Sequence, residues 1–100
     1  MREKQIEQKL VSAVKSRDGI CPKLVSPGYD GMPDRMVLLP GARIGFVEVK
    51  APEQKPRKLQ LLRHRILQGL GFKVYVLDDP AQIPDILDGI GGDNAERDNP

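Results

Sequence analysis

Cysteine and aromatic residues are scarce in this chain of 100 residues, which contains one cysteine, two tyrosines, two phenylalanines and no tryptophan. A single Cys21 cannot form an internal disulfide or a multi-cysteine zinc site, so a reducing, cytoplasmic setting is expected. No apolar run approaches the roughly 18–20 residues that span a bilayer, and no apolar signal core follows Met1. We therefore expect neither export nor association with a membrane.

The formal net charge of +2 conceals an uneven distribution of charged residues. Residues 1–77 carry fifteen Lys and Arg against seven Asp and Glu, whereas residues 78–100 carry one Arg against seven acids. A basic body suggests a polyanionic partner, although a merely solvated charged surface explains it equally well. The composition is that of one globular domain, which we expect to cover residues 1–90 and to precede a flexible acidic tail at 91–100.

Three helices are expected from the spacing of apolar residues. Residues 2–16 have an amphipathic pattern, and Gly19 is expected just beyond the end of this helix. Pro56 suits the first position of a helix that runs to about residue 69. The buried stripe of this second helix is predicted to comprise Leu59, Leu62, Ile66 and Leu70. A short third helix is expected within residues 80–90.

Four strands are expected, at residues 21–25, 35–39, 44–50 and 72–77. The Pro- and Gly-rich segment 26–33 predicts a loop after the first strand. A turn at residues 40–43 predicts that the second and third strands form a hairpin. The order is then helix, strand, strand, strand, helix, strand, helix, which predicts an α/β fold with a mixed sheet covered by helices.

Charged residues interrupt the apolar face of the strand expected at residues 44–50. Because side chains alternate between the two faces of a strand, Glu48 and Lys50 share a face with Phe46. An ion pair at a fraying strand end would explain these charges without any function. A polar site at this end of the strand is the interpretation that we favour.

Asp34 stands directly before the strand expected at residues 35–39 and follows Gly31-Met32-Pro33. Pro33 restricts the backbone of Met32, so the approach to Asp34 is fixed rather than floppy. If the two strands pair, Asp34 and Glu48 can converge, and two carboxylates suit a hard cation such as Mg²⁺ or Mn²⁺. An Asx turn is the alternative explanation for Asp34 alone.

Glu7 falls inside the apolar arc of the first expected helix, between Ile6 and Leu10. A carboxylate that faces the core needs a partner because an unpaired buried charge is costly, and a metal or its water shell would supply one. Glu3 points the same way but belongs to the first turn, where fraying is expected, so we prefer Glu7. A solvated helix margin explains either residue about equally well.

Gln60, Arg63 and His64 form a polar strip on the second expected helix, because residues three and four positions apart share a side of a helix. One histidine without a second ligand in motif spacing is poor evidence for zinc. His64 is therefore predicted to lie on a solvated helix face. Gln60 can be interpreted only together with the rest of the site.

Three segments together match a known family, namely Gly31-Met32-Pro33-Asp34, then Phe46-Val47-Glu48-Val49-Lys50-Ala51-Pro52, and then Gln60. In these motifs and their spacing the chain resembles the VRR-NUC domain (virus-type replication-repair nuclease) of the PD-(D/E)XK nuclease superfamily. The likeness covers roughly three quarters of the chain and fits the stand-alone form of bacterial viruses and prophages. It implies a restriction-endonuclease-like αβββαβ core and, for a viral protein, a place in the cytoplasm of the bacterial host.

The resemblance implies a role for each matching residue. Binding of Mg²⁺ or Mn²⁺ is implied for Asp34, Glu48, the Val49 carbonyl and, directly or through water, Glu7. Lys50 would position or activate the attacking water and stabilise charge on the phosphate, which is hydrolysed with the help of the metal. Gln60 would orient groups in the site. The predicted catalytic residues are thus Glu7, Asp34, Glu48, Lys50 and Gln60.

Basic residues surround these positions in the sequence and would contact the DNA backbone without reading bases. Besides Lys50 they are Lys55, Arg57, Lys58, Arg63, Arg65 and Lys73. The scarcity of aromatic residues argues against a platform on which single strands stack. Stand-alone members of the family resemble homodimers that cut four-way DNA junctions, and two symmetric sites suit a two-fold junction, so a homodimer is expected.

The function expected from these features is a metal-dependent endonuclease that cuts branched DNA, most often four-way (Holliday) junctions. Two alternatives remain open. One is a nuclease that acts on flaps or on linear duplex ends, and the other is a non-catalytic DNA-binding module that keeps the fold. Intact Asp34, Glu48 and Lys50 disfavour the non-catalytic alternative.

Overall fold

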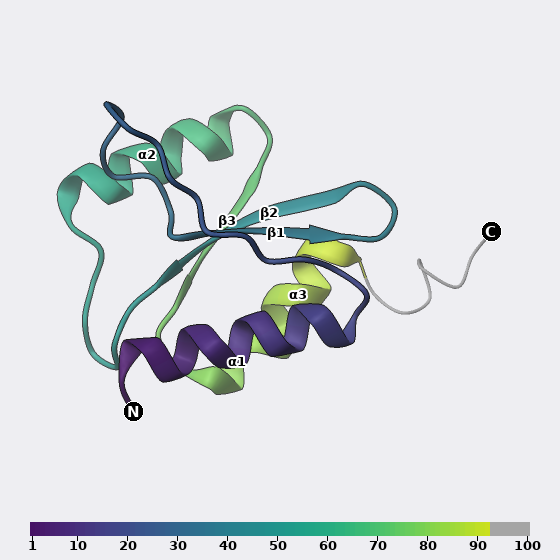
Figure 1. Cartoon of the computed structure of the whole chain (residues 1–100). Coiled ribbons are helices and arrows are strands. Elements are labelled where there is room, and N and C mark those ends of the chain that lie inside the picture. The colour runs from purple at the N-terminus through teal and green to yellow at the C-terminus, as the bar shows by residue number, and fades with distance from the viewer. Residues whose placement is uncertain (93–100) are drawn as a thin grey trace.

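The computed structural model describes residues 1–92 and arranges them as a small sheet between two helical layers (Figure 1). The elements in chain order are α1 (Glu3–Ser16), β1 (Arg35–Leu39), β2 (Arg43–Val49), α2 (Lys58–Gly69), β3 (Lys73–Leu77), the 3₁₀ turn η1 (Pro80–Gln82) and α3 (Ile83–Gly91). The predicted mixed α/β class is therefore confirmed, with helices on both faces of the sheet.

The sheet has the order β1-β2-β3. β1 and β2 pair antiparallel through a tight turn, which confirms the predicted hairpin, and β2 and β3 pair parallel. The parallel register places Glu48 opposite Val76 and Gly45 opposite Lys73. Glu48 and Val49 thus lie at the end of the sheet where the two parallel strands finish.

The hydrophobic core lies between one face of the sheet and the pair of helices α1 and α3 (Figure 1). Ile6, Leu10 and Val14 of α1 are fully buried, as their helical spacing predicts. Gly45 lets α3 approach β2 closely, because a Cβ at this position would clash with the side chain of Ile90. This layer holds the sheet rigidly under the residues of the opposite face.

Helix α2 covers that opposite face. The side of α2 that is buried against the sheet is not the side that was predicted. Its buried residues are Gln60, His64 and Leu67, one helical face at positions i, i+4 and i+7. The predicted buried stripe is exposed, with relative exposures of 41% for Leu59, 46% for Leu62, 40% for Ile66 and 70% for Leu70. The physical reason is that β2 presents the buried Glu48 to α2, and a buried carboxylate requires polar partners.

The start of α2 also differs from the prediction, because the helix begins at Lys58 rather than at Pro56. Arg57 is the N-cap residue, and its backbone N–H donates to Gln60 Oε1 at 2.8 Å. Gln60 therefore completes half of a capping box at the third helical position. This bond fixes the first residue of the helix two positions after Pro56, and it orients the Gln60 side chain.

The strand predicted at residues 21–25 is not formed. Only two isolated bridges tie this segment to β1, Ile20 with Leu38 and Lys23 with Arg35. Pro22 lacks the N–H that a continuous ladder needs, so the segment accompanies β1 without becoming a fourth strand. The αβββαβ order expected for the core therefore has one strand fewer ahead of α2.

At the C-terminal end, the predicted short helix is present as η1 followed by α3. α3 ends at the buried Gly91, one residue inside the segment expected to form the acidic tail. The rest of that predicted tail, residues 93–100, lies outside the described residues. None of the helices within residues 1–92 is long and apolar enough to cross a membrane.

Candidate active site

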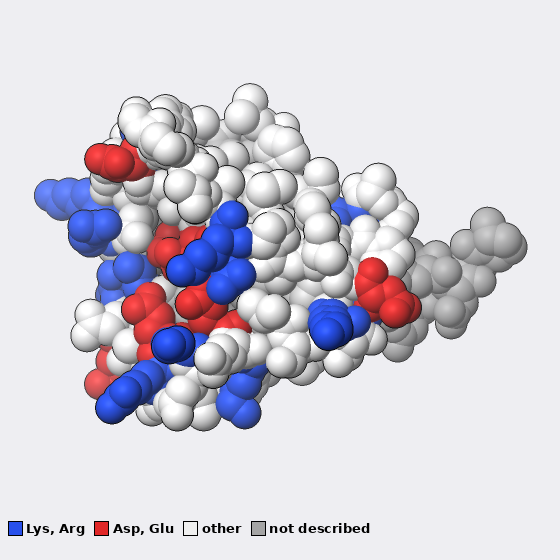
Figure 2. All heavy atoms as spheres, viewed as in Figure 1, with Lys and Arg blue, Asp and Glu red and all other residues white. Residues whose placement is uncertain are grey.

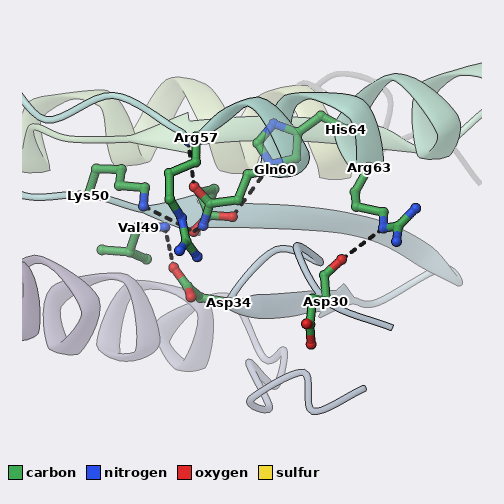
Figure 3. Close-up of polar contacts among 9 residues, drawn as sticks. Asp30, Asp34, Val49, Lys50, Arg57, Gln60, Arg63 and His64 are labelled. Atoms are coloured by element: carbon green, nitrogen blue, oxygen red, sulfur yellow. Dashed lines mark hydrogen bonds and ion pairs between the residues drawn. The ribbon is translucent and has the colours of Figure 1, made fainter. Parts of the chain in front are cut away.

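A buried polar cluster lies between β2 and α2, and Glu48 is at its centre. Figure 3 labels three of its members, Lys50, Gln60 and His64. Its side chain is 1% exposed, and its Oε2 accepts a hydrogen bond from Gln60 Nε2 at 3.1 Å. Lys50 Nζ lies 3.9 Å from the same oxygen. His64 Nε2 lies 3.5 Å from the other oxygen, Oε1. Three nitrogen groups therefore face one carboxylate, two from α2 and one from Lys50, which follows β2.

Asp34 is brought to this cluster by the loop that the sequence Gly31-Met32-Pro33 builds. Gly31 has a φ of +91°, and a Cβ at this position would lie only 2.8 Å from Leu59 Cγ on α2. Glycine thus allows the loop to pack tightly against α2. Asp34 Oδ2 accepts a hydrogen bond from the Val49 backbone N–H at 2.8 Å, so Asp34 is anchored to β2 beside Glu48 (Figure 3).

The environment of Glu48 disfavours its charged form. The pKa of its carboxyl is raised to about 8, first by burial and then by a hydrogen bond with the neighbouring Asp34 and by repulsion from it. Lys50 acts in the opposite direction, and Glu3 adds to the rise. Among residues 1–92, the buried Oε1 of Glu48 has no hydrogen-bond partner. A buried carboxylate that lies beside a second acid and keeps an oxygen without a partner is an arrangement that a cation would stabilise.

The donor set fits a magnesium-like ion. Within residues 1–92 no group of three or more His, Cys, Asp or Glu side chains is gathered closely enough to hold a metal. Mg²⁺, however, keeps several of its waters and is usually bound by one or two carboxylates together with substrate phosphates. Asp34 and Glu48 supply that number of carboxylates, and the unpartnered Oε1 of Glu48 is an available ligand atom.

Glu7, which was expected in the metal environment, is held by another partner. Its Oε2 accepts a hydrogen bond from Arg35 Nε at 2.8 Å, and Arg35 also donates to the Cys21 carbonyl. Glu7 and Glu3 line the same hollow as Asp34, but of these two only Glu3 raises the pKa of Glu48. α1 already begins at Glu3, so this residue belongs to the helix.

Lys50 and Gln60 both lie beside the Glu48 carboxylate. Lys50 follows the last residue of β2, and its backbone N–H donates to the Leu77 carbonyl at 2.9 Å, which fixes the start of its side chain. Gln60 uses both ends of its amide, since Oε1 caps α2 and Nε2 binds Glu48. The amide therefore couples the start of α2 to the carboxylate.

The basic residues predicted to contact DNA are not all alike. Four of them are exposed on the loop before α2 or on α2 itself, namely Lys55, Arg57, Lys58 and Arg65. Arg63 instead binds the loop that contains Tyr29 and Asp30. Its Nε donates to the Asp30 carbonyl, and its guanidinium lies 3.8 Å above the Tyr29 ring. Figure 2 shows Lys and Arg side chains around a group of acids at the end of the molecule where α1 begins.

Lys73 does not belong to this surface. It opens β3 opposite Gly45, and its Nζ donates to the Gly89 carbonyl of α3. Glu48 lies three residues further along β2, or about 10 Å at the rise of a β-strand. The sequence places Lys73 only a few residues after the basic part of α2, but the parallel strand carries it to the opposite end of the sheet.

His64 is the site residue that sequence reasoning missed. It is buried rather than solvated, and its side chain is 7% exposed. Burial lowers the pKa of the imidazole, and the Lys50 charge lowers it further. The available signal was its spacing of four residues after Gln60, which places both side chains on one face of α2.

The chain is similar to known proteins in both sequence and structure. No family model matches the chain. A solved structure described as a VRR_NUC domain superposes with a TM-score of 0.81 at 28% identity, covering 88% of this chain and 97% of the other. "Putative nuclease p44" of Acyrthosiphon pisum secondary endosymbiont phage 1 is 53% identical over 78 residues, which are 78% of this chain and 84% of that protein. The chain belongs to the VRR-NUC family of nucleases.

Membership of the VRR-NUC family confirms the resemblance on which the site residues were predicted, and the phage relative agrees with the phage type. The structural similarity extends over most of both chains. The described part of the chain is a VRR-NUC nuclease fold, and the cluster around Glu48 is its candidate active site.

Proposed function

We propose that this VRR-NUC domain is a divalent-metal-dependent endodeoxyribonuclease that cuts branched DNA, in particular four-way junctions. The observation that supports this most strongly is the convergence of Asp34, Glu48 and Lys50 at one end of β2. Two carboxylates that can hold Mg²⁺ or Mn²⁺ stand beside one positively charged donor. That combination suits hydrolysis of a phosphodiester, whose anionic oxygens repel a nucleophile.

In this proposal Asp34, Glu48 and the Val49 carbonyl would hold the cation, and Glu7, which is bonded to Arg35, would act on it only through water. A cation held there would supply Lewis-acid chemistry, which favours deprotonation of water and offsets charge on the phosphate. Lys50 donates to a phosphate oxygen on which negative charge develops, and its distance of 3.9 Å from Glu48 keeps it beside the reacting group. Gln60 keeps Glu48 in one orientation through its 3.1 Å hydrogen bond.

DNA would reach the site along the exposed basic residues before and on α2. Lys55, Arg57 and Lys58 follow β2 directly in the chain and are exposed. Contacts from such residues to phosphates position a duplex without reading its sequence. A nuclease of the phage type would meet this substrate in the cytoplasm of the bacterial host.

A homodimer is part of the proposal, and the outer face of α2 supports it. We define this face as Leu62, Ile66 and Leu70, which lie on one side of the helix and are 40–70% exposed. An apolar face that stays in contact with water is unfavourable, and a two-fold axis lets such a face cover itself in a second copy. Two sites related by that axis would suit the two-fold symmetry of a four-way junction.

The test is cleavage of synthetic DNA by the purified chain in Mg²⁺, in Mn²⁺ and in EDTA. A four-way junction, a flap and a blunt duplex of matched length should be compared. We expect metal-dependent symmetric cuts in the junction and little product from the other two. Preferred cleavage of the flap or of duplex ends would replace the junction as substrate, and binding without any product would indicate a non-catalytic module.

Asp34→Asn provides the test of the site, with Asp85→Asn as its matched control. Asparagine keeps the size of the side chain and an oxygen for the Val49 N–H, but it removes the charge that binds the cation. We expect Asp34→Asn to lose at least about 100-fold in cleavage rate. Asp85 is exposed on α3, in the other helical layer, and its variant should cut like the wild type.

A further inference from the structure

His64 and Glu48 present to each other the two buried side-chain polar atoms that have no hydrogen-bond partner within residues 1–92. These atoms are His64 Nε2 and Glu48 Oε1, and they lie 3.5 Å apart. Both side chains are more than nine-tenths buried, so water does not readily satisfy either atom. A buried polar group without a partner is unfavourable, and its presence here requires an explanation.

We propose that His64 is a positioning residue for Glu48 in the metal-bound state. The Nε2–H of its imidazole donates to one carboxylate oxygen while Gln60 Nε2 donates to the other. Two donors from one helix would then hold the carboxylate plane, and the other lone pairs of the two oxygens would remain available to a cation. The inference rests on the proposed function, because it requires that Glu48 binds a metal.

The geometry separates this role from a general structural one. His64 and Gln60 are four residues apart on α2 and reach the same carboxylate from the same side. Gln60 is already bonded at 3.1 Å, whereas the imidazole is slightly too far away for a well-formed bond. Catalytic hydrogen bonds are often long without the ligand and tighten when it binds. We expect that binding of a cation would fix the orientation of Glu48 and thereby shorten the distance between His64 Nε2 and Glu48 Oε1.

The chemistry explains why a histidine occupies this position. An ordinary apolar residue would leave Glu48 Oε1 without a donor, and a second lysine would add a charge that competes with the cation. A neutral imidazole offers one N–H without a net charge. Partners that orient metal ligands in this way commonly affect metal affinity by 10–100-fold when they are removed.

The experiment measures Mn²⁺ binding to the full chain by calorimetry, without DNA, in wild type, His64→Leu, His64→Gln and Leu67→Ala. Leucine removes the donor, and glutamine restores an N–H. Leu67 is a matched control, because it is buried on the same face of α2 but contributes no polar atom. Thermal unfolding in EDTA reports the stability of each variant separately.

We expect His64→Leu to bind Mn²⁺ roughly 10–100-fold more weakly and His64→Gln to bind close to the wild-type level. Leu67→Ala should lose stability in EDTA but keep its Mn²⁺ affinity. Equal affinity of wild type and His64→Leu would overturn the positioning role while leaving the nuclease proposal intact. If His64→Leu does not fold, the comparison is made with His64→Gln. A Mn²⁺ affinity of His64→Gln as low as that of Asp34→Asn would then overturn the positioning role.

Pulsed electron paramagnetic resonance of the bound Mn²⁺ adds a second readout. A positioning residue does not touch the metal, so no directly coordinated imidazole nitrogen should appear in the spectrum. A strong coupling to such a nitrogen, lost in His64→Leu, would show that His64 is a ligand and would contradict the inference. If the wild type binds no Mn²⁺ at all, both this inference and the metal-dependent function fail.

Discussion

Glu48 is the residue in which the fold and the proposed chemistry meet. It continues the apolar face of β2, yet it is an acid, and the structure buries it under α2 rather than leaving it at a frayed strand end. Without a cation its charged form is disfavoured by burial and by Asp34, which raise its pKa to about 8. We therefore expect a cation bound at this site to stabilise the charged form of Glu48.

The raised pKa of Glu48 makes a prediction about stability in EDTA. Between pH 4.5 and about 8 the unfolded chain releases the Glu48 proton while the folded chain keeps it, so the unfolding free energy should fall as the pH rises. The contribution is on the order of 1 kcal/mol per pH unit. Urea unfolding at pH 5 and pH 8 measures it as the difference between wild type and Glu48→Gln.

The isosteric glutamine removes the titration but keeps the packing, and Glu53→Gln on an exposed loop serves as the control. The contribution of Glu48 is complete below pH 4.5 and lost above about pH 8. If wild type and Glu48→Gln respond to pH in parallel, Glu48 does not carry a raised pKa. Other titrating groups, His64 included, are common to both proteins and cancel in the difference.

At the scale of single residues, the sequence indicated four members of the buried cluster but not the fifth, His64. Asp34, Glu48, Lys50 and Gln60 were recognisable because each breaks the apolar pattern or belongs to a motif. His64 was not recognised, because its spacing from Gln60 places both side chains on one side of the helix but does not tell whether that side is buried. Its burial depends on what β2 presents to α2, and this three-dimensional information is absent from the helix itself.

Among the elements, α2 shows how a buried charge can override hydrophobic periodicity. Leu59, Leu62, Ile66 and Leu70 define the more apolar arc, which in isolation should be buried. The observed helix instead buries Gln60 and His64 against Glu48. α1 followed its prediction, because the face of the sheet beneath it offers only apolar partners for Ile6, Leu10 and Val14.

The contact between α3 and β2 yields a prediction for stability at this scale. Gly45→Ala would force a methyl group into the Ile90 side chain, and overpacking of this kind costs about 1–3 kcal/mol. Gly69→Ala at the end of α2 is the matched substitution, because no atom lies within 4 Å of its added Cβ. Thermal or urea unfolding should show a clear loss for Gly45→Ala only, and equal stabilities would contradict the close packing.

For the whole molecule, the most informative surface is the outer face of α2. Leu62, Ile66 and Leu70 would be an ordinary buried stripe if a second copy covered them. The prediction that the stripe is buried would then hold for the dimer, although it is wrong for the single chain. The net charge of +2 likewise says little about the surface, since exposed basic residues lie on α2 while Glu3, Glu7 and Asp34 line one hollow.

The dimer proposal is tested by Ile66→Asp, which places a charge on the outer face of α2. We expect light scattering and sedimentation to show a dimer for the wild type and a dimer affinity weakened at least about 30-fold for the variant. Ile20→Asp is the control, because Ile20 is 63% exposed but lies outside α2. A dimer that tolerates Ile66→Asp would place the interface elsewhere, and a wild-type monomer at all concentrations would exclude this pairing.

We propose that the cluster at the end of β2 performs metal-dependent cleavage of DNA. The most direct measurement is single-turnover cleavage of a four-way junction in Mg²⁺ by wild type, Lys50→Ala and Lys15→Ala. Lys15 is an exposed lysine in the last turn of α1 and serves as the control. We predict that wild type and Lys15→Ala cut at similar rates, while Lys50→Ala is slower by about 100-fold or more and still binds the junction. No cleavage by the wild type, or equal cleavage by Lys50→Ala, would contradict the account.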